Sequence, residues 1–324
     1  MNVFKWIQKH LVFSIMLGMV LGFVIGVLWD TSFLRVSINY LSFLMVYPMM
    51  VTLNYKSLLE KGNIKLQLIT QIVNFGYLPL LAYFFGIWFF KDEIYFRLGI
   101  MLIALLPTSG MTVSWTVMAK GNVKEAIRMI VIGLMLGGLL TPILMNLYLG
   151  ETIDIPFTTI LGQITMIVFV PMVLGFLTQN RLKKHYGVET FQTRIKPVFP
   201  FISTIAVIVL ITIVMSLRAN MLLQDPMLLL RIIIPVSLGY FVMLISLHLI
   251  GSVLFNAADR IAFINGTMIR SLSVALAIAL SLFSKEGAEV ALVIAIAYIV
   301  QVQLAAFYVK MQLKNMTKTN HVVQ

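Results

Sequence analysis

Two interrupted apolar segments carry the residues of this sequence whose types and spacing could bind a small molecule. The first interruption runs from Leu105 to Gly110 (LLPTSG) and the second from Phe263 to Gly266 (FING). Proline removes an amide donor and glycine weakens helix propagation, so the backbone can unwind there and leave N–H and C=O groups free. Gly110 and Gly266 lie 156 residues apart in a chain of 324. Paired breaks at corresponding places in two halves indicate the binding site of a secondary transporter.

Arg270, which follows the second break, is the sharpest candidate. It lies ten residues beyond Arg260, and a helical rise of 1.5 Å per residue places it about 15 Å deep in a membrane. An arginine at that depth costs roughly 2.5–3.5 kcal/mol, so it must face a partner or a wet cavity. All twelve acidic residues fall in loops or at the ends of apolar runs. We therefore expect a bound anion, held by Arg270 and half-helix N-termini, to supply the counter-charge. Snorkelling to an interface is the alternative.

The predicted solute-binding residues lie beside the two breaks. They are Thr108, Ser109, Gly110, Thr112, Ser114, Asn265, Gly266, Arg270 and Ser271. A simple proline kink is the alternative interpretation of the first break. The second break, at the corresponding place in the other half, favours a binding site over a simple kink. Other polar residues inside the apolar runs are Asn74, Gln163, His248, Gln301 and Gln303. Each of these alone is more often an interhelical hydrogen bond than a ligand. His248 is a possible proton carrier, although a neutral packing histidine is the commoner use.

The chain has no cysteine, which excludes disulfides, thiolate metal sites and cysteine nucleophiles. We expect no metal and no cofactor. An intramembrane enzyme would need paired carboxylates, a Ser-His dyad or a metal-ligand cluster inside the bilayer. Since no acid is buried in the apolar runs and His248 is the one candidate base there, the sequence does not predict an enzyme.

Composition indicates the elements that must position these residues. Hydrophobic residues make up 60% of the chain and charged residues 11%, whereas soluble domains carry about 25% charged residues. This is the composition of a polytopic membrane protein. The net charge of +12 is spread between apolar runs, which is typical of membrane topology rather than of nucleic-acid binding. The expected partners are a small-molecule anion and the lipid bilayer, with no nucleic acid and with a homodimer left open.

Ten apolar runs are long enough to cross a hydrocarbon core of about 30 Å. They cover residues 11–29, 35–53, 66–90, 95–119, 124–149, 157–179, 197–217, 228–255, 260–283 and 288–309. Five runs fall in each half, and an odd number forces the second half to enter from the opposite side. The sequence therefore predicts an all-α polytopic membrane protein of ten transmembrane helices. Two inverted five-helix repeats, 1–150 and 151–324, form one membrane unit with helices four and nine broken.

The lysines and arginines set the orientation of these ten helices. Seventeen fall on the side of the N-terminus and six on the opposite side, with Arg270 left in the interior. Because cytoplasmic loops carry the excess of positive charge, both termini are predicted to be cytoplasmic. We expect a multi-pass protein of the cell (plasma) membrane.

The stretch from Pro107 to Asn122 (PTSGMTVSWTVMAKGN), with VYPMMV at 46–51 and LLTP at 139–142, resembles the bile acid:sodium symporter and arsenite permease superfamily. The resemblance spans nearly the whole chain. It implies two inverted five-helix repeats, a panel domain and a core domain, and broken helices four and nine that cross. The pattern around Pro107, Met111 and Trp115 looks closer to the arsenite branch.

The departures from the family pattern are informative. The positions that match the sodium ligands of the bile-acid branch are Thr112, Val113, Ala126, Ile130, Ile264 and Met268. Of these, Thr112 alone keeps a suitable oxygen. In the arsenite branch a functional cysteine follows the helix-four proline and helix nine carries a glutamate, but here the matching residues are Thr108 and Ser271. Capture of arsenite by a thiolate is therefore excluded.

We thus expect an alternating-access carrier for a small anionic or organic-anion solute that does not use the family's sodium sites. An arsenite or metalloid efflux permease without a cysteine ligand is one alternative, and a sodium-coupled organic-anion symporter is another. A channel or receptor ranks lower, because it would not need matched breaks in inverted halves. The sequence leaves open the solute, the coupling ion, the direction of transport and the oligomeric state.

Overall fold

A computed structural model describes residues 11–59, 61–106, 108–150, 157–283 and 286–322. Regular structure within these ranges is entirely helical, as predicted. Nine helical segments there are long and apolar enough to cross a membrane. The fourth predicted run, 95–119, is occupied by two shorter helices separated by a break. The chain is therefore an all-α polytopic membrane protein, and the inverted relation between its halves stays a prediction.

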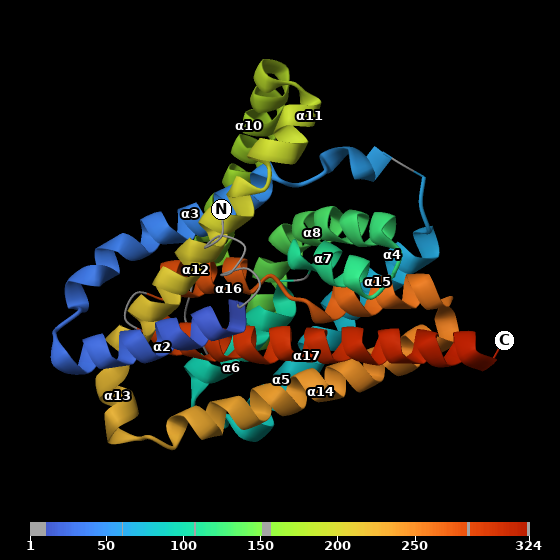
Figure 1. Cartoon of the computed structure of the whole chain (residues 1–324). Coiled ribbons are helices and arrows are strands. Elements are labelled where there is room, and N and C mark those ends of the chain that lie inside the picture. Colours follow the sequence, from blue (N-terminus) through green and yellow to red (C-terminus); the bar gives the residue numbers. More distant parts are fainter. Residues whose placement is uncertain (1–10, 60, 107, 151–156, 284–285, 323–324) are drawn as a thin grey trace.

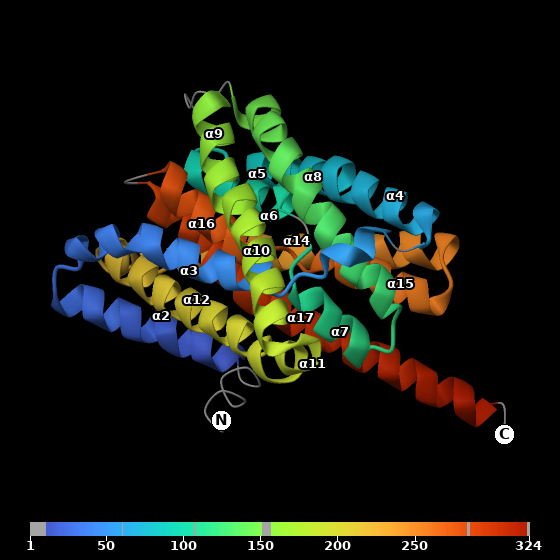
Figure 2. The same ribbon diagram turned by 90° about the horizontal axis from the view of Figure 1, so that it is seen from above.

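We call one group of helices the panel. Its members are α2 (Leu11–Leu28), α3 (Ser37–Val51), α9 (Phe157–Ile164), η4 (Thr165–Phe169), α10 (Val170–Tyr186) and α12 (Val198–Leu217). Three of them, α2, α3 and α12, lie side by side at the left of Figures 1 and 2. Helix α12 packs against both α2 and α3, and α10 packs against α3. The Tyr47 hydroxyl on α3 lies 2.7 Å from the Thr178 hydroxyl on α10. Ser203 on α12 donates a 2.6 Å hydrogen bond to the carbonyl of Met45.

Glycines bring α2 and α12 close together. Gly18, Gly22 and Gly26 recur every four residues on α2 and face α12. A Cβ added at Gly22 would lie 2.1 Å from the backbone oxygen of Thr212, and one at Gly26 would lie 2.1 Å from that of Ser216. Small residues at this spacing let two membrane helices pack backbone to backbone. The stripe therefore holds the panel together from within the chain.

The remaining long helices form a second group, which we call the core. Its members are α4 (Ile64–Ile72), η3 (Val73–Tyr77), α5 (Leu78–Phe89), α6 (Ile94–Leu105), α7 (Met111–Met118), α8 (Val123–Leu149), α14 (Leu228–Leu254), α15 (Ala257–Met268), α16 (Leu272–Leu282) and α17 (Gly287–Val322). The α15–α16 segment is enclosed by protein along its whole apolar stretch. Short elements connect the long helices. Those within the panel are η1 (Ser32–Val36), α11 (Val188–Thr190) and η5 (Phe191–Ile195), and those between the panel and the core are η2 (Tyr55–Leu59) and α13 (Ala219–Gln224).

The first break lies where the sequence predicts it, between the end of α6 at Leu105 and the start of α7 at Met111. Pro107, which helped to predict it, lies outside the described residues. The second break does not lie at Asn265-Gly266, because α15 continues through both residues to Met268 and α16 begins at Leu272. Gly266 serves close packing instead, since an added Cβ would lie 2.4 Å from the sulfur of Met129. The prediction of its position was therefore wrong by a few residues, and Arg270 lies inside the break itself.

Candidate functional site

The two breaks lie side by side and complete each other's backbone hydrogen bonds. The N–H of Ser109 donates to the carbonyl of Ile269 at 2.9 Å, and the N–H of Ser271 donates to that of Leu106 at 3.0 Å. Unwound backbone at membrane depth is tolerated where protein or water satisfies its polar groups. The reciprocal pair satisfies four such groups and fixes the crossing of the broken helices.

Side chains at the first break reinforce this crossing. Thr108 has a φ of 48°, the left-handed region that a β-branched residue rarely adopts. Its hydroxyl donates a 2.8 Å hydrogen bond to the carbonyl of Gly266. The hydroxyl of Thr112 donates at 3.4 Å to the carbonyl of Asn265, whose side-chain amide donates at 3.3 Å to the hydroxyl of Thr116. The unusual backbone of Thr108 therefore aims its hydroxyl at the other broken helix.

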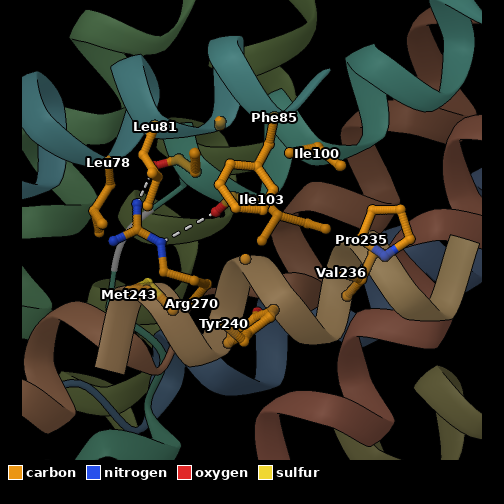
Figure 3. A pocket seen from close by; sticks show the side chains of 13 residues that line it. Leu78, Leu81, Phe85, Ile100, Ile103, Pro235, Val236, Tyr240, Met243 and Arg270 are labelled. Atoms are coloured by element: carbon orange, nitrogen blue, oxygen red, sulfur yellow. Dashed lines mark hydrogen bonds between the residues drawn. The ribbon is translucent and has the colours of Figure 1, made fainter. Parts of the chain in front are cut away.

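Arg270 extends from the second break, and its side chain is 1% exposed. Its Nε donates to the carbonyl of Ile103 at 3.1 Å, and its Nη2 donates to that of Ala104. Its Nη1 donates to the amide oxygen of Asn74 at 2.6 Å and to the carbonyl of Thr267 at 3.1 Å. Figure 3 shows the two bonds to α6. Four of the five guanidinium N–H groups are thus bonded to neutral protein oxygens.

The position of these oxygens explains how a cation is tolerated here. Ile103 and Ala104 lie in the last turn of α6, and Thr267 lies in the last turn of α15. The C-terminal end of a helix carries a partial negative charge, which stabilises a cation. No ion pair in the described part of the chain involves Arg270. Its positive charge is therefore stabilised by dipoles, with no carboxylate paired to it among the residues that the structure describes.

Gln301 on α17 holds the backbone on both sides of Arg270. Its Oε1 accepts from the N–H of Arg270 at 2.8 Å and from the Tyr240 hydroxyl at 2.9 Å, while its Nε2 donates to the carbonyl of Arg270 at 3.2 Å. Gln301 and Asn74 are among the polar residues that the sequence places inside apolar runs. The structure brings both to the second break, as interhelical partners rather than as exposed ligands.

A cavity of about 70 Å³ borders Arg270 between α5, α6 and α14 (Figure 3). Most of its wall is apolar, with Tyr240 as the other polar lining residue beside the arginine. Helices α5 and α14 pack chiefly against other core helices. The guanidinium therefore lies on the side of the break that faces α5 and α14.

The predicted solute-binding residues converge on the crossing, but most are enclosed by it. Seven of the nine are buried: Thr108, Ser109, Thr112, Asn265, Gly266, Arg270 and Ser271. Gly110 is half-buried beneath the panel, because an added Cβ there would lie 3.0 Å from the Cε of Met49 on α3. Ser114 is exposed on α7.

Two polar atoms at the crossing are buried without a partner in the described part of the chain, namely Asn265 Oδ1 and Ser271 Oγ. Buried polar atoms without partners are uncommon, so both are candidates to meet a ligand or a water molecule. His248, the possible proton carrier, is half-buried on α14, eight residues and about 12 Å beyond Tyr240. None of the hydrogen bonds described at the crossing involves it.

Single cysteines in this naturally cysteine-free chain test the burial at the first break. We expect Ser114→Cys to react readily with a polar maleimide in purified protein, and Thr112→Cys to react far more slowly, because Thr112 is fully buried. Gln192→Cys, at an exposed position of η5, is the positive control. Labelling is measured by mass spectrometry over time. Equal rates at residues 112 and 114 would mean that Thr112 is open to water in the resting protein.

Sequence reasoning missed a polar cluster where α4, α8 and α15 begin. Their N-cap residues are Asn63, Asn122 and Asn256. The side-chain amides of all three donate to the carboxylate of Asp259, at 3.0, 2.7 and 3.0 Å respectively. Glu125 forms a neighbouring buried ion pair. The pattern Asn-x-x-acid at 122–125 and 256–259 resembles a capping box and could have predicted the cluster.

Comparison with known proteins agrees with this architecture. Residues 40–225 match the Sodium Bile acid symporter family. The arsenical-resistance protein Acr3 of Alkaliphilus metalliredigens is 23% identical over 254 residues, covering 73% of this chain and 70% of that protein. An uncharacterized transporter of Synechocystis, slr0944, is 22% identical over 92% of this chain and 85% of its own length.

The sodium/bile acid cotransporter 7-B of Xenopus laevis is 27% identical over 157 residues, which is 46% of this chain and 43% of that protein. The match to this relative thus spans less than half of its length. The family match itself covers more than half of the chain. This membrane protein therefore belongs to the sodium bile acid symporter family, whose members are transporters and not enzymes.

Proposed function

We propose that this transporter is an alternating-access carrier for a small anionic or organic-anion solute, and that it works without the sodium sites of its family. The observation that carries the proposal is the positive charge of Arg270, buried at the crossing of the broken helices and bonded to neutral oxygens. Because these guanidinium N–H groups already donate to protein oxygens, we expect Arg270 to attract a solute anion through its electrostatic field and not through a direct hydrogen bond. An anion within about 8 Å gains about 2 kcal/mol at an effective dielectric constant of 20.

The N-termini of α7 and α16 add to the positive potential at the crossing. Both helices begin directly after a break, and a helix N-terminus carries a partial positive charge. Ser271 precedes the first residue of α16, and its hydroxyl has no partner in the described part of the chain. A solute anion near this hydroxyl would meet an unpaired donor and a field of the right sign.

The positions matched to the family's sodium ligands support the second half of the proposal. Ala126, Ile130, Ile264 and Met268 are buried and have no side-chain oxygen. A sodium ion at these places would find few ligands. We propose the plasma membrane as the location and cytoplasmic termini as the orientation, on the strength of the seventeen-to-six distribution of basic residues.

Uptake into proteoliposomes tests the proposal. We expect uptake of small organic anions, each supplied as a radiolabelled compound, to saturate and to be unchanged when sodium is replaced by potassium or choline. A neutral analogue of the best anion should be transported at least tenfold less well. Uptake that sodium alone restores, with a saturable dose response, would contradict the sodium-independent mechanism. Equal uptake of the neutral analogue would contradict the charge preference.

Arsenite efflux is the second candidate function, favoured by the similarity to Acr3 over 73% of this chain. The chain offers no thiolate, so a metalloid would have to be held by hydroxyl and amide groups. A thermal-shift screen of purified protein against arsenite and a panel of organic anions separates the two candidates. Saturable stabilisation by arsenite alone would favour the second.

A further inference from the structure

The guanidinium of Arg270 joins three separate segments of the core. It bonds to carbonyls at the end of α6, to a carbonyl at the end of α15, and to Asn74 in η3. The segment η3 is a π-helical turn, an irregularity that recurs at functional sites. The Nδ2 of Asn74 is buried without a partner among the described residues, whereas its Oδ1 lies 2.6 Å from Nη1. The π-helical turn therefore supplies the side-chain oxygen of Asn74 as an acceptor for the guanidinium of Arg270.

We propose that Arg270 is a built-in cation that closes the crossing of the broken helices, with Asn74 as its positioning residue. Four neutral oxygens surround the guanidinium, three from helix ends and one from an amide. Without a cation these dipoles would point at one another inside a membrane, where unsatisfied backbone groups cost several kcal/mol each. The covalently attached charge removes any need for a soluble ion at this place.

Arg270 would hold the crossing together in this way whether the solute is neutral or an anion. A smaller residue at position 270 should leave a vacancy lined by oxygens. Such a vacancy has the size and the acceptors to take a free guanidinium ion. Alkali metal ions also prefer oxygen ligands, but they lack the planar N–H geometry that matches these four acceptors.

Chemical rescue of Arg270→Ala tests the proposal. Purified variant and wild-type protein are compared by thermal unfolding in detergent, with 0 to about 20 mM guanidinium chloride and with choline chloride at the same ionic strength. We expect the variant to unfold about 5 °C or more below wild type, and guanidinium to restore most of that loss saturably. Wild type should not respond, and choline should rescue neither protein.

Phe90→Ala is the matched control, because Phe90 is a large buried side chain without charge. It should lose stability without any guanidinium response. Arg270→Lys should fall between Arg270→Ala and wild type, since an ammonium cannot reach all four oxygens. If Arg270→Ala is as stable as wild type, or if choline and guanidinium rescue it equally, Arg270 does not act as a built-in cation.

Variants of Asn74 keep the proposal testable if Arg270→Ala does not fold. Asn74→Asp places a carboxylate against the guanidinium and should raise the unfolding temperature, whereas Asn74→Leu should lower it. Equal losses in both variants would contradict the positioning role of Asn74. Asn74→Asp also separates the structural role of Arg270 from the proposed anion transport. The variant keeps the guanidinium in place, but the new carboxylate cancels the electrostatic field that would attract an anion. Anion uptake should then fall at least tenfold in a protein that remains stable.

Discussion

Asp259→Ala should clearly destabilise the folded protein and lower its yield. Asp259 is 6% exposed, and its carboxylate accepts from the amides of Asn63, Asn122 and Asn256. Alanine would leave three amides without their acceptor. Asn63 and Asn122 are half-buried and Asn256 is exposed, so the cost falls mainly on the first two, at up to about 1–3 kcal/mol for each orphaned group. Two such losses are a substantial part of the roughly 5–15 kcal/mol by which folded proteins are typically stable.

The yield of monodisperse protein in size-exclusion chromatography and the unfolding temperature measure this effect. Asp92→Ala, at an exposed acid after α5, is the matched control and should leave both quantities unchanged. Asp259→Asn should lie between, because it keeps one acceptor oxygen and loses the charge. If Asp259→Ala unfolds within about 2 °C of wild type, the three amides find water or other acceptors.

The polar cluster at Asp259 bears on the crossing of the broken helices. It joins the N-cap residues of α4, α8 and α15. Helix α4 continues into η3, which carries Asn74, and α15 ends with the carbonyl of Thr267. Two acceptors of the Arg270 guanidinium are thus held on helices whose opposite ends are fixed at Asp259. Loss of the cluster should loosen the crossing as well as the helix ends.

The first break was predictable because its cause is local. Gly110, at the N-cap of α7, and the proline before Thr108 disfavour helix by their own chemistry. The second break has no glycine or proline at residues 269–271. It is held open by groups distant in sequence, since Gln301 bonds both backbone groups of Arg270 and Leu106 accepts from Ser271. Sequence spacing cannot reveal such partners.

Arg270 illustrates the limit of counting charges along a sequence. Its burial and the lack of an acidic partner among the described residues follow the sequence argument. Its actual partners are mostly backbone carbonyls, which every residue possesses and which no composition reveals. Only the fold decides which carbonyls lie at a helix end with free acceptor capacity. That a bound anion supplies the counter-charge stays a prediction. Such an anion would be attracted by the electrostatic field of Arg270 and would not need a direct hydrogen bond to it.

The panel depends on a signal that the sequence does contain. Gly18, Gly22 and Gly26 follow the small-xxx-small spacing within the first apolar run. This spacing often marks helix dimers in membranes, but here the partner is α12 of the same chain. The stripe therefore gives no support to a homodimer through α2.

Gly22→Ala should separate α2 from α12 and destabilise the panel. The added Cβ would lie 2.1 Å from the backbone oxygen of Thr212 and 3.0 Å from the Cβ of Met215. Backbone atoms cannot rotate out of the way, so the helices must move apart by about 1 Å and lose contacts along their length. We expect a loss of 5 °C or more, roughly 2 kcal/mol, in thermal unfolding.

Gly162→Ala on α9, also in the panel, is the matched control, because nothing lies within 4 Å of its added Cβ. Both substitutions replace glycine by the best helix former, which by itself favours the folded state by about 1 kcal/mol. Gly162→Ala should therefore leave stability unchanged or raise it, while Gly22→Ala lowers it. The opposite signs separate packing from helix propensity. If both variants are stabilised, α2 and α12 are not in backbone contact, and something other than the glycine stripe holds the panel together.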